Sequence, residues 1–149
     1  MPGSASDITV KDEYAFVAVG EEGLCSINIS DPRNPEEICF YSTLGWISDV
    51  SVADDFAYMA DEKEGGLRIA DISDPDNSFE VGFLDTPEPV ENLELVGTHV
   101  YITDDNGFRV IDVSDPENPS QVGFVIRRAM ISRLLETTLI YPVICMAVC

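Results

Sequence analysis

The chain has 149 residues, and its 28 acidic residues outnumber its eight lysines and arginines, which gives a formal net charge of −20. Such a surface repels nucleic acids and anionic bilayers, and it lacks the lysine and arginine stripe that nucleic-acid binders carry. The composition therefore excludes nucleic acid as a partner and argues against a membrane surface. An acidic surface of this kind is most simply a hydrated face.

One phrase recurs three times along the chain, each time running from a glycine to a Ser-Asp-Pro turn. Its copies are Gly23–Pro32, Gly66–Pro75 and Gly107–Pro116. The aspartates of the three turns are 43 and then 41 residues apart, a period in the range of four-stranded propeller blades. The chain is therefore a repeat protein.

Each repeat predicts four strands in the same order. In the first repeat these are an alternating apolar pair at Ile8 and Val10, an aromatic-rich segment at 14–17, a nearly continuous apolar segment at 24–29 and a last segment at 37–40. Such segments favour strands, and the polar, glycine-containing stretches between them favour hairpins. The sequence thus predicts an all-β fold, a partial β-propeller of about three four-stranded antiparallel blades. The predicted boundaries are 1–46, 47–89 and 90–126 for the blades and 127–149 for a non-repeat apolar tail.

The Ser-Asp-Pro turns have a structural interpretation and a metal-binding one. The aspartate oxygen can accept backbone N–H groups ahead of it, and proline fixes φ at the next position, so turn formation accounts for both residues. Carboxylates clustered on turns also suit calcium, for which the candidate ligands are Asp71, Asp74, Asp112 and Asp115. The spacing lacks the EF-hand loop pattern, and Asn28 stands where the later repeats have aspartate. We therefore expect no metal and no other cofactor.

The core phrase of the later repeats carries a family resemblance. Leu67–Asp71 and Phe108–Asp112 each run into a Ser-Asp-Pro turn, and with the period they resemble the LVIVD repeat family over about residues 7–126. The first repeat departs from that pattern at Cys25 and Asn28. The resemblance implies a β-propeller, often on secreted or cell-surface proteins of bacteria and archaea, and it supplies no catalytic residues. The N-terminus has neither the charged nor the apolar region of a signal peptide, so a surface location is implied by the resemblance alone.

Three blades are too few to close a propeller, which typically has four to eight. The outer faces of the first and third blades would stay open, and large exposed apolar faces are rare on monomers. Three interpretations follow: the chain is a fragment of a longer protein, it pairs with a second copy into a six-bladed ring, or its tail covers one face of an open stack. The expected partners are accordingly a protein partner, a second copy or missing blades of the same chain.

The tail, residues 127–149, differs in composition from the repeats. It holds three of the eight basic residues and only one of the 28 acidic ones, and no fourth repeat begins on schedule. An aberrant gene end explains this change without any function. A helix that covers blade 3 and an amphipathic anchor over 127–135 are alternatives. The uncharged run at 139–149 is shorter than the roughly 20 residues that span a bilayer.

Two cysteines of the first repeat, Cys25 and Cys39, are expected to lie roughly opposite each other on its third and fourth strands. A disulfide between them is conceivable, but directly opposed positions often give strained geometry. Cys39 also aligns with Gly82 and Gly123, a position that favours a small residue. Two buried free thiols are the alternative.

The recurrent and the unique polar residues give three candidate contact residues. Arg68 and Arg109 occupy one repeat position, and we expect them to pair with Asp61 and Asp104 across the hairpin rather than to contact a substrate. Trp46 is the only tryptophan and is not demanded by the repeat. It is either an exposed recognition or assembly residue or a plug between blades.

Catalysis has no clear candidate set. The single histidine, His99, aligns with aromatic residues at the start of a strand and is expected to pack. The leading prediction is therefore a non-enzymatic propeller segment, an interaction or structural module of a larger surface or secreted protein. The alternative is a hydrolase or lyase whose acidic residues converge on a channel once the ring is complete.

Overall fold

The structure is a computed structural model that describes residues 3–126 of the chain. The alternatives considered for residues 127–149 fall outside the described residues. The described part is built from strands, with no helix, and therefore contains no helix that could cross a membrane. The strands are β1 (Asp7–Lys11), β2 (Tyr14–Ala18), β3 (Leu24–Asn28), β4 (Glu36–Tyr41), β5 (Ile47–Ala53), β6 (Phe56–Asp61), β7 (Gly66–Asp71), β8 (Phe79–Asp85), β9 (Val90–Val96), β10 (His99–Asp104), β11 (Gly107–Asp112) and β12 (Ser120–Ile126).

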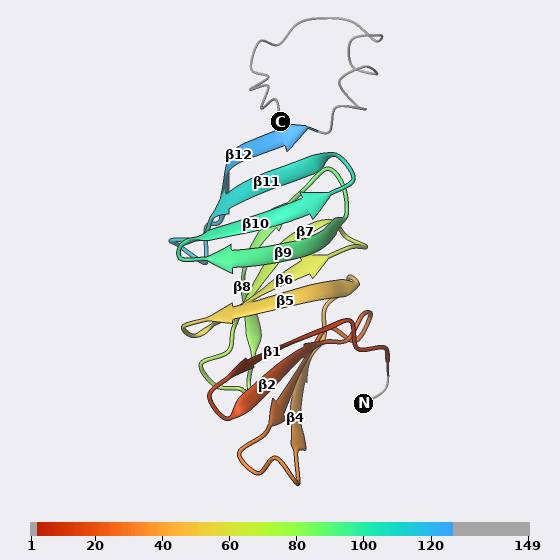
Figure 1. Ribbon diagram of the computed structural model, residues 1–149, viewed down its shortest axis with the longest axis vertical. Coiled ribbons are helices and arrows are strands. Elements are labelled where there is room, and N and C mark those ends of the chain that lie inside the picture. Colours follow the sequence, from red (N-terminus) through yellow and green to blue (C-terminus); the bar gives the residue numbers. More distant parts are fainter. Residues whose placement is uncertain (1–2, 127–149) are drawn as a thin grey trace, which may run out of the picture.

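These strands form three separate four-stranded antiparallel sheets, ordered β1-β2-β3-β4, β5-β6-β7-β8 and β9-β10-β11-β12. We call them blades 1, 2 and 3. Figure 1 shows the blades following one another along the long axis, with blade 1 at the bottom and blade 3 at the top. The first strands of neighbouring blades are in contact, β1 with β5 and β5 with β9. The predicted all-β class and the four-stranded meander of each repeat are confirmed.

Local sequence explains the shared irregularities of the blades. The hairpin between the first two strands turns at Asp12, Asp54 or Gly97, each with a positive φ of 53°, 48° or 60°. Aspartate and glycine are among the residues that tolerate this conformation. Between the third and fourth strands, each blade has a one-residue register shift at the same place, next to Ile27, Ala70 or Ile111. Such a bulge bends the strand and increases its twist.

The bulge corrects the expected juxtaposition of the two cysteines. Cys39 lies opposite Ser26, and Cys25 lies opposite Phe40. Both thiols are free, with Cys25 buried and Cys39 half-buried. Burial, followed by the nearby charge of Glu37, raises the pKa of the Cys25 thiol to about 11, so this thiol is protonated and unreactive at neutral pH.

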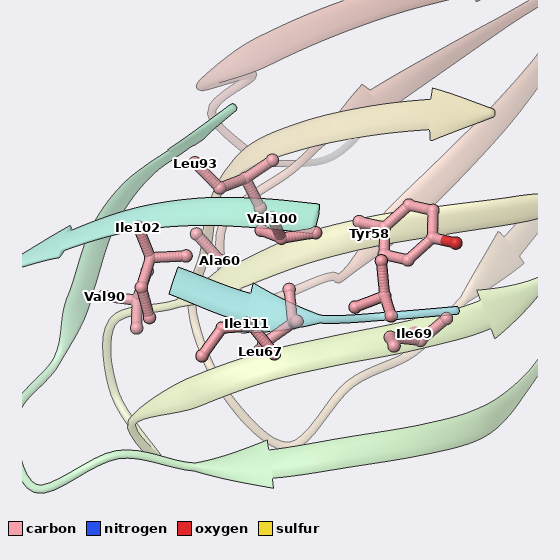
Figure 2. Close-up of a cluster of buried hydrophobic side chains, with 10 residues drawn as sticks. Tyr58, Ala60, Leu67, Ile69, Val90, Leu93, Val100, Ile102 and Ile111 are labelled. Carbon is pink, nitrogen blue, oxygen red and sulfur yellow. The ribbon is translucent and has the colours of Figure 1, made fainter. Parts of the chain in front are cut away.

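The hydrophobic core lies between the blades. One cluster joins blade 1 to blade 2 around Phe16, Leu24 and Met59. A second joins blade 2 to blade 3, and Figure 2 shows side chains of β6 and β7, such as Tyr58 and Leu67, meeting those of β9, β10 and β11. Each fully buried aliphatic side chain stabilises the fold by about 1.5–3 kcal/mol. Each blade is therefore held by its neighbour.

Candidate functional site

Two carboxylates link the first strands of neighbouring blades. Asp7 of blade 1 accepts a hydrogen bond from the Val50 N–H of blade 2, with Oδ2 at 3.1 Å from the nitrogen. Asp49, at the equivalent position of blade 2, accepts the Leu93 N–H of blade 3 at 2.8 Å. At both interfaces, therefore, a backbone N–H of the later blade donates a hydrogen bond to an aspartate of the earlier blade. The residue at this position in blade 3 is Asn92, which is exposed.

Asp49 carries an electrostatic cost at neutral pH. Burial and a hydrogen bond with the Asp7 carboxyl raise the pKa of Asp49 to about 6, although the Leu93 N–H opposes the shift. Because the pKa is above its ordinary value of 3.8, the stability that this group contributes is fully present below about pH 4 and is lost as the pH rises through 6.

Replacing Asp49 with asparagine, the residue that blade 3 uses, is expected to stabilise the protein at pH 7.5. Asparagine keeps an oxygen for the Leu93 N–H and removes the ionisation. Since Asp49 is only half-buried, we expect a gain of about 1 kcal/mol at pH 7.5 and little gain at pH 4. Urea denaturation at both pH values measures the difference. An effect independent of pH would contradict the assigned cause.

Two buried ion pairs fix the hairpins of blades 2 and 3, as expected from the aligned residues. The Asp61 carboxylate is fully buried and lies 2.5 Å from Arg68 Nε, while its other oxygen accepts the N–H groups of Trp46, Lys63 and Glu64. Arg68 also contacts Glu80 at 2.9 Å. Burial acts to lower the pKa of Arg68, but the two carboxylates outweigh it, and the net pKa is raised.

Blade 3 repeats this arrangement with Arg109 at 2.6 Å from Asp104, which accepts the N–H groups of Asn106 and Gly107. Arg109 also donates to Gln121. In both blades the carboxylate is occupied by an arginine and by the backbone of its own turn. The geometry favours a structural role for Arg68 and Arg109 over contact with a substrate.

The four calcium candidates lie on two separate turns. Asp71 and Asp112 each accept hydrogen bonds from the serine two residues ahead, from its backbone N–H and from its hydroxyl group. These bonds lower the pKa of both carboxyls. Asp74 and Asp115 each accept a backbone N–H and an asparagine amide of their own turn. Within residues 3–126 no three acidic, histidine or cysteine side chains gather in a way that could hold a metal ion.

Trp46 belongs to an open groove that touches all three blades. The groove has a volume of about 570 Å³ and lies where β1, β5 and β9 begin. It is lined by Ser6, Trp46, Ser48, Glu62, Pro89, Glu91 and Asn92. Two of these residues are acidic and none is basic, so the groove favours a positively charged group.

The half-buried indole of Trp46 plays a structural part as well. Its ring rests on Gly20 of blade 1, where a Cβ would come within 3.0 Å of the ring carbons, and its backbone N–H donates to Asp61. Trp46 therefore packs between blades 1 and 2, is half-buried and is one of the residues that line the groove. Trp46 stands out in the sequence as the only tryptophan, whereas Glu62 and Glu91 do not depart from its acidic background.

Comparison with known proteins gives a family model and several structures. The model described as "LVIVD repeat" matches residues 2–43, 45–86 and 89–126. Similar solved structures include the computationally designed protein Ika8 (13% identity, TM-score 0.60, 72% of this chain and 33% of that chain). Another is Hsv2 of Kluyveromyces lactis (9% identity, TM-score 0.58, 82% of this chain and 37% of that chain). A third is the N-terminal domain of Nup159 (6% identity, TM-score 0.54, 85% of this chain and 32% of that chain).

The structural similarity concerns the fold alone, since the sequence identities are low. Together with the three four-stranded sheets, it establishes a partial β-propeller. This chain spans about a third of the length of the solved structures that it matches. A search of curated proteins found no match.

Proposed function

The chain belongs to the LVIVD repeat family, and from that premise we propose that it is a non-enzymatic propeller module that recognises a basic segment of a protein partner. The groove at Trp46 is the observation that carries this proposal. It is polar, open and contributed by all three blades, as expected of recognition loops on a rigid scaffold.

The chemistry of the groove supports a cationic ligand. Glu62 and Glu91 supply negative charge, and half-buried Trp46 lines the same groove, so we expect its indole to contact a lysine or arginine side chain. A cation over an exposed indole gains about 0.5–1 kcal/mol. The net charge of −20 would also steer basic partners toward this surface.

The hydrogen-bonded carboxylates of the hairpins and of the blade interfaces support a role without catalysis. Asp61 and Asp104 are held by arginine and backbone N–H groups, and Asp7 and Asp49 join blade to blade. Each thus has a structural task that leaves it poorly placed to transfer protons to a substrate. The alternative channel enzyme would need convergent carboxylates that are free of such tasks.

Membership of a larger assembly is part of the same proposal. The chain spans about a third of the structures that it matches, which supports a segment completed by further blades or further chains. We also propose a secreted or cell-surface location, on the family resemblance alone.

Titration with hexalysine tests the recognition site, with the emission of Trp46 as the signal because it is the only tryptophan. We expect saturable binding that the double variant Glu62→Gln, Glu91→Gln weakens about 2- to 30-fold, since exposed charge contacts contribute about 0.2–1 kcal/mol each. Hexaglutamate should give no change in emission.

A matched double variant separates the groove from general charge. Glu36→Gln, Glu117→Gln makes the same change in net charge at exposed positions on a fourth strand and on a Ser-Asp-Pro turn. We expect its affinity to stay within about twofold of the unmodified protein. Equal weakening by both double variants would show that hexalysine binds the acidic surface as a whole, and the groove would be rejected.

A further inference from the structure

The outer face of blade 3 repeats the surface that blade 2 buries against blade 3, and its apolar side chains are partly exposed. In blade 2, Leu67 and Ile69 of this face are fully buried by blade 3, and Tyr58 is 5% exposed. Their counterparts in blade 3 are Phe108, Val110 and Tyr101. Phe108 is 38% exposed and stacks on Tyr101 with ring centroids 5.9 Å apart. Val125 at 41% and Val96 at 58% extend the exposed apolar surface.

A glycine on this face, Gly123, leaves space that its counterpart in blade 2 uses for contact with the next blade. In blade 2, Gly82 lies under the Ser-Asp-Pro turn of blade 3, and a Cβ there would come within 2.0 Å of the Pro116 carbonyl oxygen. The counterpart in blade 3 is Gly123, where a Cβ would meet only Val110 of its own blade, at 3.7 Å. Blade 3 thus presents the same glycine seat, with no turn seated on it among the described residues.

The hydrogen-bond link between blades is also incomplete at this end. Asp7 and Asp49 each accept a hydrogen bond from a backbone N–H of the next blade. Asn92 has the same repeat position and is exposed. Its side-chain oxygen can accept such an N–H as theirs do. An apolar face, a glycine seat and an acceptor therefore lie on one side of blade 3.

The opposite end of the chain presents part of the complementary set, on the first strand of blade 1, while Val17, Val19 and Cys25 of the same face are already buried within the chain. Val50 of blade 2 is 2% exposed against blade 1, but its counterpart in blade 1, Ile8, is 60% exposed, and Val10 is 58% exposed. The backbone N–H of Ile8 has the same repeat position as the Val50 N–H, which donates a hydrogen bond to Asp7. The turn at Pro32 corresponds to the turn at Pro116 that seats on Gly82.

We propose that the open face of blade 3 binds the open face of blade 1 in a second copy of this chain, so that two chains close a six-bladed ring. The Pro32 turn of each copy then seats on Gly123 of the other, and Asn92 accepts the N–H of Ile8. Continuity with the interfaces between blades 1 and 2 and between blades 2 and 3 selects this occupant. It does not depend on the ligand of the Trp46 groove.

The three blades of the described residues agree with an assembly of two chains. A head-to-tail contact between copies makes a ring only where the rotation closes. One chain supplies three blades, three chains would supply nine, and propellers typically have four to eight. Two copies of these three blades supply six, which lies within that range.

Sedimentation velocity on the full chain tests the proposal. We expect twice the chain mass of 16.3 kDa. Gly123→Tyr should raise the dissociation constant at least about 100-fold, because a large side chain fills the space that the Pro32 turn of the other copy would take. The protomer should keep its circular dichroism, since no neighbour crowds that position. Leu44→Tyr adds the same bulk at a position that is 85% exposed and lies in the loop between β4 and β5, and it should remain a dimer.

Mixing two disabled variants distinguishes the head-to-tail contact from a symmetric one. Ile8→Glu should also be monomeric, since it places a charge on the blade 1 face. A mixture of Gly123→Tyr and Ile8→Glu chains contains one intact pairing, between blade 3 of the second and blade 1 of the first, so a mixed dimer should form. An unmodified chain that stays monomeric at 100 μM, assembles beyond a dimer or resists Gly123→Tyr, or a mixture without the mixed dimer, would overturn the proposal.

Discussion

Replacing Asp61 with alanine is expected to lower the free energy of unfolding by about 3–5 kcal/mol. The substitution leaves Arg68 without its closest carboxylate and three backbone N–H groups, those of Trp46, Lys63 and Glu64, without their acceptor. Unmade buried hydrogen bonds and an uncompensated charge are among the most costly changes a fold can suffer. Since small domains are stable by about 5–15 kcal/mol, this single change should remove a large part of the total.

Urea denaturation followed by Trp46 emission measures the loss, and Asp74→Ala provides the control. Asp74 also accepts a backbone N–H, from Asp76, but it is exposed on its turn, so its replacement should cost no more than about 1 kcal/mol. Equal losses for the two variants would mean that solvent replaces the buried contacts of Asp61 without penalty, and the assigned role would be wrong.

Blade 1 shows what the fold requires when this ion pair is missing. Val19 and Cys25 stand where the other blades have aspartate and arginine, and both are buried in an apolar cluster. The hairpin there satisfies itself with backbone hydrogen bonds, including Val19 N–H to Gly23 and Glu22 N–H to Val19. In blade 2 the Asp61 carboxylate accepts the N–H groups of its hairpin and of Trp46. In blade 1 backbone carbonyl groups of the hairpin take the place of such a carboxylate.

The repeat made much of this predictable. Three aligned copies fixed the strand order, and the coincidence of Arg68 with Arg109 and of Asp61 with Asp104 pointed to the ion pairs that the structure contains. Repetition is informative here because a residue kept at one place in several blades must satisfy the same local geometry each time.

Contacts between blades were harder to infer. Period-two alternation tells which face of a sheet a side chain occupies, but it says nothing about what lies across the gap. For this reason the sequence pattern does not reveal that Asp7 and Asp49 accept hydrogen bonds from the next blade. The prediction that Cys25 and Cys39 lie opposite each other was wrong because a bulge adds one residue to β4. Counting residues from the turn cannot detect a bulge.

A second large loss is expected where blade 2 meets blade 3, at Gly82. A Cβ at this position would lie 2.0 Å from the Pro116 carbonyl oxygen, well inside contact distance, and the atom in its way belongs to the backbone of a proline turn. Gly82→Ala must therefore move the blades apart, and we expect it to lower the free energy of unfolding by about 2–4 kcal/mol, at the upper end of overpacking effects.

Gly123→Ala is the matched control, because the same substitution there meets only Val110 at an ordinary 3.7 Å. In dilute solution, where chains are separate, the control should stay within about 0.5 kcal/mol of the unmodified protein. The loss at Gly82 arises inside one chain and should be independent of protein concentration, whereas any loss at Gly123 should grow as chains associate. Denaturation at two protein concentrations measures both. Equal losses at the two glycines in dilute solution would show that contacts within blade 3 require a glycine at position 123. The proposed contact with a second copy would then not explain this residue.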